Sequence, residues 1–212
     1  MRPRKKLMLI GGGGHCFSVI DSVISTDSYD DIGIIDTVDN FFPGVSVIGT
    51  DDDIPELIKN GWNSAFVAVG SVGNTVVRRK LYEMIKRYGL NIPTIIDPTA
   101  SVAKSAEVKE GSFLGKKAIV NAGAKIGLCS IINTGAVIEH ECERGDFSHI
   151  SPGSTVCGRV RIGSDSHIGA GSVVIQQITI GNNVLVGAGS VVVKDLGSGV
   201  KAFGNPCKVV SK

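Results

Sequence analysis

An aliphatic residue recurs at every sixth position along the second half of this 212-residue chain. The series comprises Val102, Val108, Leu114, Val120, Ile126, Ile132, Ile138, Arg144, Ile150, Val156, Ile162, Ile168, Val174, Ile180, Val186 and Val192. Arg144 is its one exception. A branched apolar residue repeated with this period is typical of a parallel β-helix, in which three repeats close one triangular coil. The spacing therefore predicts such a coil.

Two further positions of the repeat have a restricted composition. The residue two places before each aliphatic position is usually small, as at Ala118 and Ser148. We expect the aliphatic residue and this small residue both to point into the coil. A glycine often follows the aliphatic residue directly, as at Gly127 and Gly145, and we expect these glycines to give the corners their backbone freedom. The period does not specify the hand of the coil.

Composition excludes several classes of protein. A net charge of +2 and a pI near 8.3 provide no concentrated basic surface, so we expect no nucleic-acid partner. The apolar run at residues 7–10 is too short for a signal sequence or a membrane span, so we expect a cytoplasmic protein. The five cysteines follow neither a disulfide framework nor a metal-binding spacing, and we predict no metal.

A different pattern precedes the repeats. Short apolar segments at residues 7–10, 32–36, 65–69 and 92–96 alternate with helical patterns at 15–25, 54–60 and 75–88. Alternating strands and helices indicate a small parallel sheet of Rossmann type. We therefore predict an α/β domain at residues 1–96 and a β-helix domain at residues 97–212, with the joint inside 91–98, a segment that contains two prolines.

The first predicted strand is followed by a turn of four consecutive glycines, Gly11 to Gly14, and then by His15. Such a loop lets backbone amides approach a diphosphate at a helix N-terminus, and Gly13, Gly14 and His15 are the candidate contacts. Asp36 ends the next strand and could accept a hydrogen bond from a ribose or a base. The match to a dinucleotide-binding motif is incomplete, and a tight strand-to-helix turn without a ligand is the alternative.

The register of the repeats identifies side chains that can react. His140 and Glu141 fall on a corner, where a neutral histidine beside a carboxylate could act as a general base. Gly158 lies one coil beyond His140, and its amide could contact an acyl oxygen. An exposed pair without a catalytic role is the alternative. Cys142 points inward and is a poor nucleophile.

Two other residues stand out in the coil. Arg144 occupies an inward position, where an unpaired guanidinium is costly, and Glu143 or Asp146 is its expected partner. His149 is half a coil from His140 and projects from an outward face, so it could join the site only across an interface between subunits.

As a set, these residues resemble the left-handed β-helix sugar acyltransferases, specifically sialic-acid O-acetyltransferases and bacillosamine-pathway N-acetyltransferases. The motifs that carry the resemblance are Gly11–His15, Ile34–Asp36, Asp97–Ala100, Asn133–Glu141, Gly145–Pro152 and Gly204–Lys208. The resemblance implies a left-handed coil, a homotrimer with sites between subunits, and acetyl-CoA as donor. It also implies His140 as general base, Glu141 as its partner and the Gly158 amide on the thioester carbonyl.

The same resemblance assigns binding residues. Asn133 and His149 would line the active site, the corner amides of Ala170 and Ala188 would follow the pantetheine arm, and Lys208 would bind the cofactor. The first domain would hold the UDP of a sugar acceptor near His15 and Asp36. This chain departs from the family pattern at Arg144 and at Cys207, where alanine is more usual.

Three functions remain open at this point. The leading hypothesis is N-acetylation of the 4-amino group of a UDP-linked 4-amino-4,6-dideoxy sugar. O-acetylation of sialic acid is the second, because a general base also deprotonates a hydroxyl. A scaffold without catalytic activity is the third, and it leaves His140 and Glu141 without a role.

Overall fold

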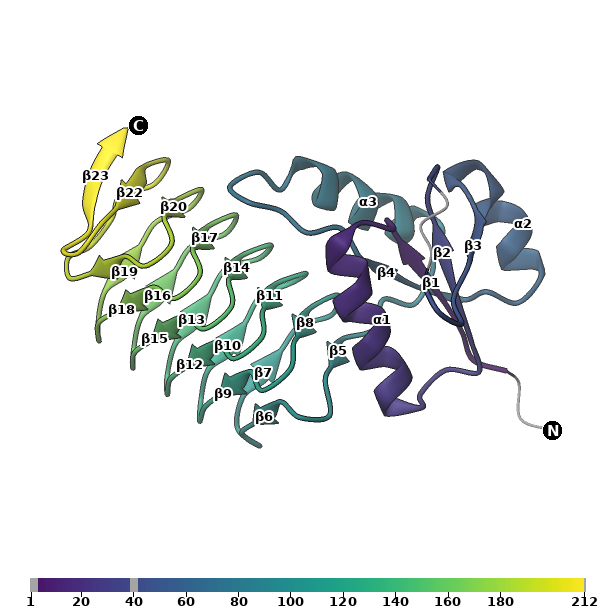
Figure 1. The fold of residues 1–212 in the computed structure, drawn as a ribbon, viewed down its shortest axis with the longest axis horizontal. Helices are drawn as coiled ribbons and strands as arrows, with labels where there is room; N and C mark the ends of the chain where they lie inside the picture. Colours follow the sequence, from purple (N-terminus) through teal and green to yellow (C-terminus); the bar gives the residue numbers. More distant parts are fainter. Residues whose placement is uncertain (1–3, 39–41, 212) are drawn as a thin grey trace.

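The computed structural model describes residues 4–38 and 42–211. A small α/β domain lies at one end, and a regular stack of triangular coils extends from it to the C-terminus (Figure 1). Both predicted folds are therefore present. Among the residues that the structure describes, no helix has the length and apolar character needed to cross a bilayer.

The α/β domain contains one parallel sheet in the order β3-β2-β1-β4. Its elements are β1 (Lys6–Ile10), α1 (Gly14–Thr26), β2 (Asp31–Ile35), β3 (Val47–Gly49), η1 (Asp51–Asp53), α2 (Ile54–Lys59), β4 (Ser64–Val67) and α3 (Val76–Arg87). Side chains of β1 alternate between the faces: Leu7 and Leu9 pack in the core formed with α1, and Met8 and Ile10 pack in the core formed with α2 and α3. The sheet is therefore covered on both sides.

One predicted strand has a different place. Only Ile95–Ile96 of the segment 92–96 form a strand, β5, and they pair with the β-helix rather than with the small sheet. The fourth strand of the small sheet is β3, which the sequence analysis did not predict. The exact boundary between the domains remains a prediction.

The β-helix has three faces, which we name by the contacts or the chemistry of their outward side chains. The docking face, which meets the first domain, contains β5, β8 (Phe113–Leu114), β11 (Ile131–Ile132), β14 (His149–Ile150), β17 (His167–Ile168), β20 (Leu185–Val186), β22 (Lys201–Phe203) and β23 (Lys208–Ser211). The apolar face contains β6 (Ser101–Val102), β9 (Ile119–Val120), β12 (Val137–Ile138), β15 (Thr155–Val156), β18 (Val173–Val174) and β21 (Val191–Val192). The charged face contains β7 (Glu107–Val108), β10 (Lys125–Ile126), β13 (Glu143–Arg144), β16 (Arg161–Ile162) and β19 (Thr179–Ile180).

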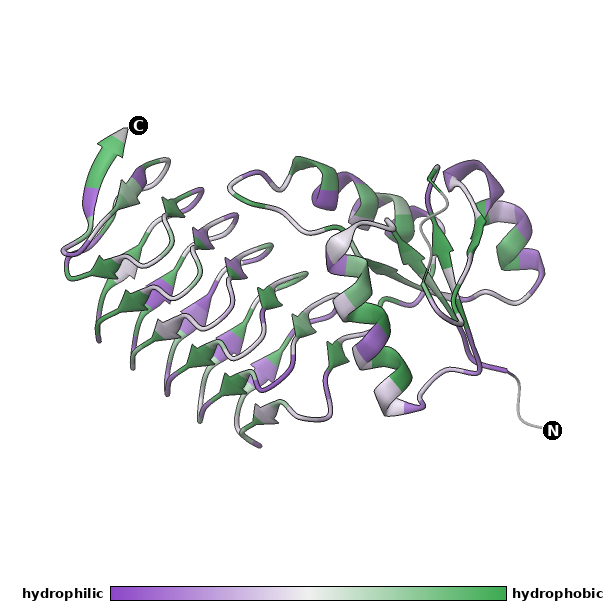
Figure 2. Ribbon diagram, in the orientation of Figure 1, coloured by the Kyte–Doolittle hydropathy of each residue, from purple (hydrophilic) through white to green (hydrophobic). Residues whose placement is uncertain are grey.

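The interior of the coil follows the predicted register. Ile132, Ile138 and Val156 are completely buried, and so are the small residues Ala136 and Ser148 that precede such positions. Hydrophobic residues recur in coil after coil along the whole stack (Figure 2). Because each coil buries its apolar residues against the next, the repeat itself builds one continuous core.

The glycines after the aliphatic positions have a different purpose from the one predicted. The left-handed corner residue is three places after the aliphatic position, as at Glu141 (φ 59°) and Gly153 (φ 66°). A Cβ atom on Gly127 would lie 2.6 Å from the backbone of Gly145, and one on Gly163 would lie 2.6 Å from the backbone of Asn182. The prediction of backbone freedom was wrong, because close approach of the next coil is what requires glycine there.

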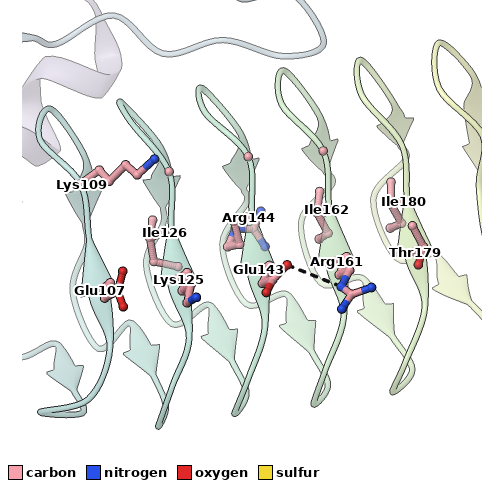
Figure 3. A pocket seen from close by; sticks show the side chains of 13 residues that line it. Glu107, Lys109, Lys125, Ile126, Glu143, Arg144, Arg161, Ile162, Thr179 and Ile180 are labelled. Carbon is pink, nitrogen blue, oxygen red and sulfur yellow. Dashed lines mark ion pairs between the residues drawn. The ribbon is translucent and has the colours of Figure 1, made fainter.

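Arg144 is enclosed in the coil, in the same column as Ile126 and Ile162 (Figure 3). Burial lowers the pKa of its guanidinium to about 9. Among the described residues, its one hydrogen-bond partner is the Ser148 hydroxyl, 3.3 Å from Nη2, and Nε and Nη1 have none.

The predicted partners of this arginine were therefore wrong. Glu143 projects from the charged face and pairs with Arg161 at 3.5 Å, as the dashed line in Figure 3 marks. Asp146 lies at a corner, where its carboxylate accepts the amide of Leu128. A carboxylate on the outer surface or at a corner cannot reach a side chain that points to the centre of the coil.

Polar contacts attach the α/β domain to the docking face. Arg79 of α3 forms a two-pronged ion pair with Asp165, with both N–O distances 2.8 Å. Ser22 of α1 donates to Asp97 at 2.7 Å. The buried Arg78 donates to the carbonyl oxygen of Cys129. These contacts set the position of the glycine-rich loop relative to the coils.

Candidate active site

One corner of the β-helix carries a histidine and a carboxylate in contact. His140 and Glu141 follow β12, and His140 Nδ1 lies 3.1 Å from Glu141 Oε2. This contact assigns the proton to Nδ1 and leaves Nε2 as an acceptor. Both side chains are half exposed. A neutral imidazole held in this tautomer can remove a proton from an amine or a hydroxyl.

Arg159 completes this corner, although the sequence analysis did not single it out. Its Nε donates to Glu141 Oε2 at 3.0 Å, and its backbone amide donates to the His140 carbonyl oxygen at 3.0 Å. The hydrogen bonds from Arg159 and then from His140 lower the pKa of the Glu141 carboxyl. The available signal was the spacing, because corner residues one coil apart lie above one another.

Gly158 lies directly beneath the imidazole ring. A Cβ atom on Gly158 would be 2.6 Å from His140 Nε2, so any side chain would displace the ring. Within residues 4–38 and 42–211, its amide N–H has no hydrogen-bond partner. An unpaired backbone donor beside the basic nitrogen provides the geometry that an oxyanion contact needs.

A second edge of the coil, between the docking and apolar faces, presents a series of open corners. Pro152, Ala170 and Ala188 stack at this edge, and backbone hydrogen bonds join their successive coils. In the described chain the amides of Ala170 and Ala188 have no partner. At the third edge, by contrast, the Asp146 amide donates to the Ser164 hydroxyl at 3.1 Å. The second edge therefore offers unpaired donors to an extended ligand.

An apolar groove of about 470 Å³ runs beside the second edge. Its lining includes Ala170 and Ala188, together with His149 and Phe203. Lys208 lies on β23 opposite Phe203 and does not itself line the groove. The structure thus brings Ala170, Ala188 and His149 to one groove.

His149 is buried, although it was predicted to project from an outward face. A loop of the first domain covers it, and its Nδ1 donates to the Ser71 carbonyl oxygen at 2.9 Å. Its Nε2 accepts from Asn133 Nδ2 at 3.3 Å. Burial lowers the pKa of His149 to about 3, so this ring is neutral near pH 7. The ring of His167 packs edge to face with it, with ring centroids 4.8 Å apart.

The glycine-rich loop has two halves with different reasons for glycine. Gly11 has a φ of 99° and packs closely against Val69. No atom lies within 4 Å of a Cβ built on Gly13 or Gly14, so packing does not require glycine at either position. Gly13 is the N-cap of α1 and provides no side-chain cap. The amides of the first turn are therefore accessible to an anion.

Asp36 lies close to this loop and lines a cavity of about 290 Å³ at the carboxyl ends of β1 and β2. Its Oδ2 accepts the Gly12 amide at 2.6 Å, and this bond is the main cause of the lowered pKa of Asp36. Ligands of parallel α/β sheets bind at this edge.

His15 points away from that cavity. Its ring packs edge to face with that of Phe113 on the docking face, with ring centroids 5.2 Å apart, and burial lowers the pKa of His15 to about 4. His15 therefore lies between the glycine-rich loop and the coils.

The predicted catalytic residues and the predicted cofactor residues lie on different edges. His140, Glu141 and Gly158 are on the edge between the apolar and charged faces, whereas Asn133 and His149 adjoin the second edge. The whole apolar face separates them within one chain. No group of three or more His, Cys, Asp or Glu side chains in the described residues could hold a metal ion.

Comparisons with known proteins match both parts of the chain. The PglD N-terminal domain family matches residues 6–85, and the family described as hexapeptide repeat of succinyl-transferase matches residues 159–194. The first range falls in the α/β domain and the second in the β-helix. The two family matches therefore agree with an α/β fold that is followed by a β-helix.

Solved structures match the chain over nearly its whole length. It is 36% identical to a histidine-to-asparagine variant of perosamine N-acetyltransferase from Caulobacter crescentus, in complex with CoA and GDP-perosamine, with a TM-score of 0.92 over 98% of this chain and 97% of that chain. It is also 36% identical to the acetyltransferase domain of PglB from Neisseria gonorrhoeae FA1090, in complex with acetyl coenzyme A, with a TM-score of 0.92 over 98% and 100% of the two chains. WeeI from Acinetobacter baumannii AYE, at 24% identity and a TM-score of 0.87 over 97% and 100%, shares the fold.

Proposed function

Because this chain belongs to the left-handed β-helix sugar acetyltransferases, we propose that it acetylates the 4-amino group of a nucleotide-linked 4-amino-4,6-dideoxy sugar. The protein is an acetyltransferase, and acetyl-CoA is its co-substrate. The perosamine enzyme, which is 36% identical, binds CoA together with a nucleotide-linked amino sugar, and this similarity supports an amine as the acceptor.

In the proposed reaction, His140 Nε2 removes a proton from the amine while the amine nitrogen attacks the thioester carbonyl carbon. The carbon–sulfur bond then breaks, and the proton passes from His140 to the CoA thiolate. Glu141, held by Arg159, stabilises the imidazolium that forms between these steps. The Gly158 amide donates to the carbonyl oxygen as it becomes negative.

The groove at the second edge is the proposed binding site for acetyl-CoA. The unpaired amides of Ala170 and Ala188 would donate to the pantetheine arm, and the apolar lining would cover its methylene groups. His149 and Asn133 would adjoin the thioester. Lys208 is assigned to the proposed cofactor site by the family resemblance alone.

We propose a homotrimer, because one chain does not bring His140 to this groove. The outward side chains of the apolar face form a stripe of Ile119, Val137, Thr155, Val173 and Val191. Contact between subunits along this stripe would bury apolar surface and bring the His140 corner of one subunit to the groove of the next.

We assign the nucleotide to the glycine-rich loop, with UDP as the proposed carrier and the cytoplasm as the proposed compartment. The accessible amides near Gly13 and Gly14 support a diphosphate there, and Asp36 lines the adjoining cavity. Uracil and guanine both present N–H donors, so a carboxylate alone does not choose between them. The choice between UDP and GDP requires a direct measurement.

The unpaired Gly158 amide beside His140 Nε2 carries this proposal. The test is CoA release from acetyl-CoA with four acceptors: UDP-linked and GDP-linked 4-amino-4,6-dideoxy sugars, free sialic acid, and a UDP-linked sugar without an amine. Mass spectrometry of the product identifies the acetylated group. Acetylation of sialic acid alone would replace this proposal with O-acetylation, and preference for the GDP-linked amine would replace UDP.

A further inference from the structure

The loop between β4 and α3, residues 68–75, extends from the first domain over the coils (Figure 1). Val72 of this loop lines the groove to which we assign acetyl-CoA. A Cβ atom built on Gly73 would lie 3.5 Å from Leu185, a coil residue that lines the same groove. The β4–α3 loop therefore provides one wall of a groove whose other lining residues all come from the coils.

The same loop fixes the tautomer of a histidine in this groove. The Ser71 carbonyl oxygen lies 2.9 Å from His149 Nδ1, and a carbonyl oxygen can only accept a hydrogen bond. The proton of the neutral ring is therefore on Nδ1, and Nε2 is left to accept from Asn133. Movement of the Ser71 carbonyl group would release both the proton and the orientation of the ring.

The start of the loop is held by the first domain itself. The Ala68 amide donates to the Ile10 carbonyl oxygen at 2.9 Å, and Val69 packs closely against Gly11. These contacts fix the first residues of the loop. The span at residues 71–74, which reaches the groove, must be held from its other end.

The other end of the loop is held by a carboxylate of the coils. Thr75, the last loop residue, donates its hydroxyl to Asp165, and one helical turn later Arg79 forms its two-pronged ion pair with the same carboxylate. Asp165 lies on the third edge, across the docking face from the groove, and neither Asp165 nor Arg79 lines the groove. A two-pronged pair fixes both distance and orientation, so this carboxylate sets where the loop ends.

We propose that Asp165 is a positioning residue for acetyl-CoA, because through Arg79 it holds the β4–α3 loop against the groove. Loss of the pair lets the loop move away from the coils, so that Ser71 no longer orients His149. The assignment rests on the part of the proposed function that places acetyl-CoA in this groove. It does not depend on which sugar accepts the acetyl group.

A second ion pair between α3 and the coils provides a matched control. Lys86 pairs with Glu110 at 3.2 Å, and Glu110 also accepts the Tyr82 hydroxyl. Each of the two carboxylates therefore accepts one cationic group and one hydroxyl. Lys86 is seven residues beyond Arg79, about 10 Å along the helix and away from the loop.

Isothermal titration with acetyl-CoA compares the wild type with the loop variants Arg79→Met and Asp165→Asn and with the control Lys86→Met. Both loop variants should bind acetyl-CoA about fivefold more weakly, a size typical of residues that act on a ligand through other groups. The control should bind as the wild type does. The affinity for UDP and for GDP should not change in any variant, because the start of the loop is held separately. In NMR spectra of protein with ¹⁵N-labelled histidine, the loop variants should lose the Nδ1–H tautomer of His149.

Three results would overturn the assignment of Asp165. The first is wild-type affinity for acetyl-CoA in both loop variants. The second is equal weakening in Lys86→Met, or toward the nucleoside diphosphate, because the loss would then reflect the attachment of the first domain in general. The third is weaker binding with an unchanged tautomer of His149, which excludes the route through Ser71. If Asp165→Asn does not fold, Arg79→Met decides by the same criteria.

One further variant separates this assignment from the proposals on which it rests. Ala170→Trp fills the groove, so wild-type affinity for acetyl-CoA in this variant would show that the cofactor site itself is wrong. Loss of binding in Ala170→Trp with unchanged binding in the loop variants would refute only the role of Asp165. Failure to acetylate any nucleotide-linked amino sugar would refute the proposed function and leave this result intact, because the titration contains no acceptor.

Discussion

An active site shared between subunits allows two inactive variants to restore each other. His140→Ala removes the proposed base from one edge of the coil, and Ala170→Trp fills the groove at another. Both residues are exposed corner residues, so neither change disturbs the buried core of the coil. Each variant alone should form trimers and should have very low acetyltransferase activity.

The restored activity can be calculated from the arrangement of the site. In trimers assembled at random from equal amounts of the two variants, about one interface in four pairs an intact His140 with an intact groove. Co-expression of the two variants should therefore recover about 25% of wild-type CoA release per site, a figure that follows from random cyclic assembly. Intact-mass analysis of the purified trimers checks the subunit ratio.

A matched mixture distinguishes a shared site from a site within one subunit. Wild type co-expressed with the double variant His140→Ala, Ala170→Trp should also retain about one quarter of the activity if the site is shared. A site within one chain would leave about half in this mixture and none in the mixture of single variants. That second pattern, in trimers of verified composition, would refute the reasoning.

Three further predictions test individual side chains. His140→Ala should lower turnover by about 10²- to 10⁴-fold without changing acetyl-CoA affinity, because it removes the proposed base and not a proposed binding group; steady-state kinetics and titration check this. Arg144→Met should raise the free energy of unfolding in urea by about 1–4 kcal/mol, since it removes a buried guanidinium with two unpaired nitrogens; a loss of stability would contradict the assigned burial cost. The pKa values of His149 and His15, about 3 and about 4, lie below their ordinary 6.5, so the unfolded chain binds more protons as the pH falls below 6.5. The free energy of unfolding should then decrease by about 1.4 kcal/mol per pH unit for each histidine until the folded values are reached, and urea titrations at pH 7 and 5 should show a smaller decrease in His149→Asn.

The coil was predictable because its signal is one-dimensional. Each interior position of a β-helix meets the equivalent residue of the next coil, so the same size and polarity recur at a fixed interval. The stacking of Gly158 beyond His140 follows from the same interval and is confirmed by the hydrogen bond between Arg159 and the His140 carbonyl oxygen. The purpose of the glycines was less accessible, because the distance between adjacent coils is a property of the folded stack.

Contacts between distant segments were not accessible from the pattern. The outward position of His149 in its strand was predicted correctly, but the strand pattern does not reveal that a loop from residue 71 covers it. The same holds for β5, which pairs with a coil strand although it follows the first domain in the chain. Two segments that lie far apart in sequence leave no periodic trace where they meet.

The sequence by itself determined the two folds, the register of the coil and the corner on which His140 and Glu141 meet, because these depend on short-range spacing. Only the tertiary structure decided which face of the coil receives the first domain, and with it the burial of His15 and His149. The physical reason is that docking depends on the summed complementarity of two surfaces, and the residues of each surface are scattered along the chain.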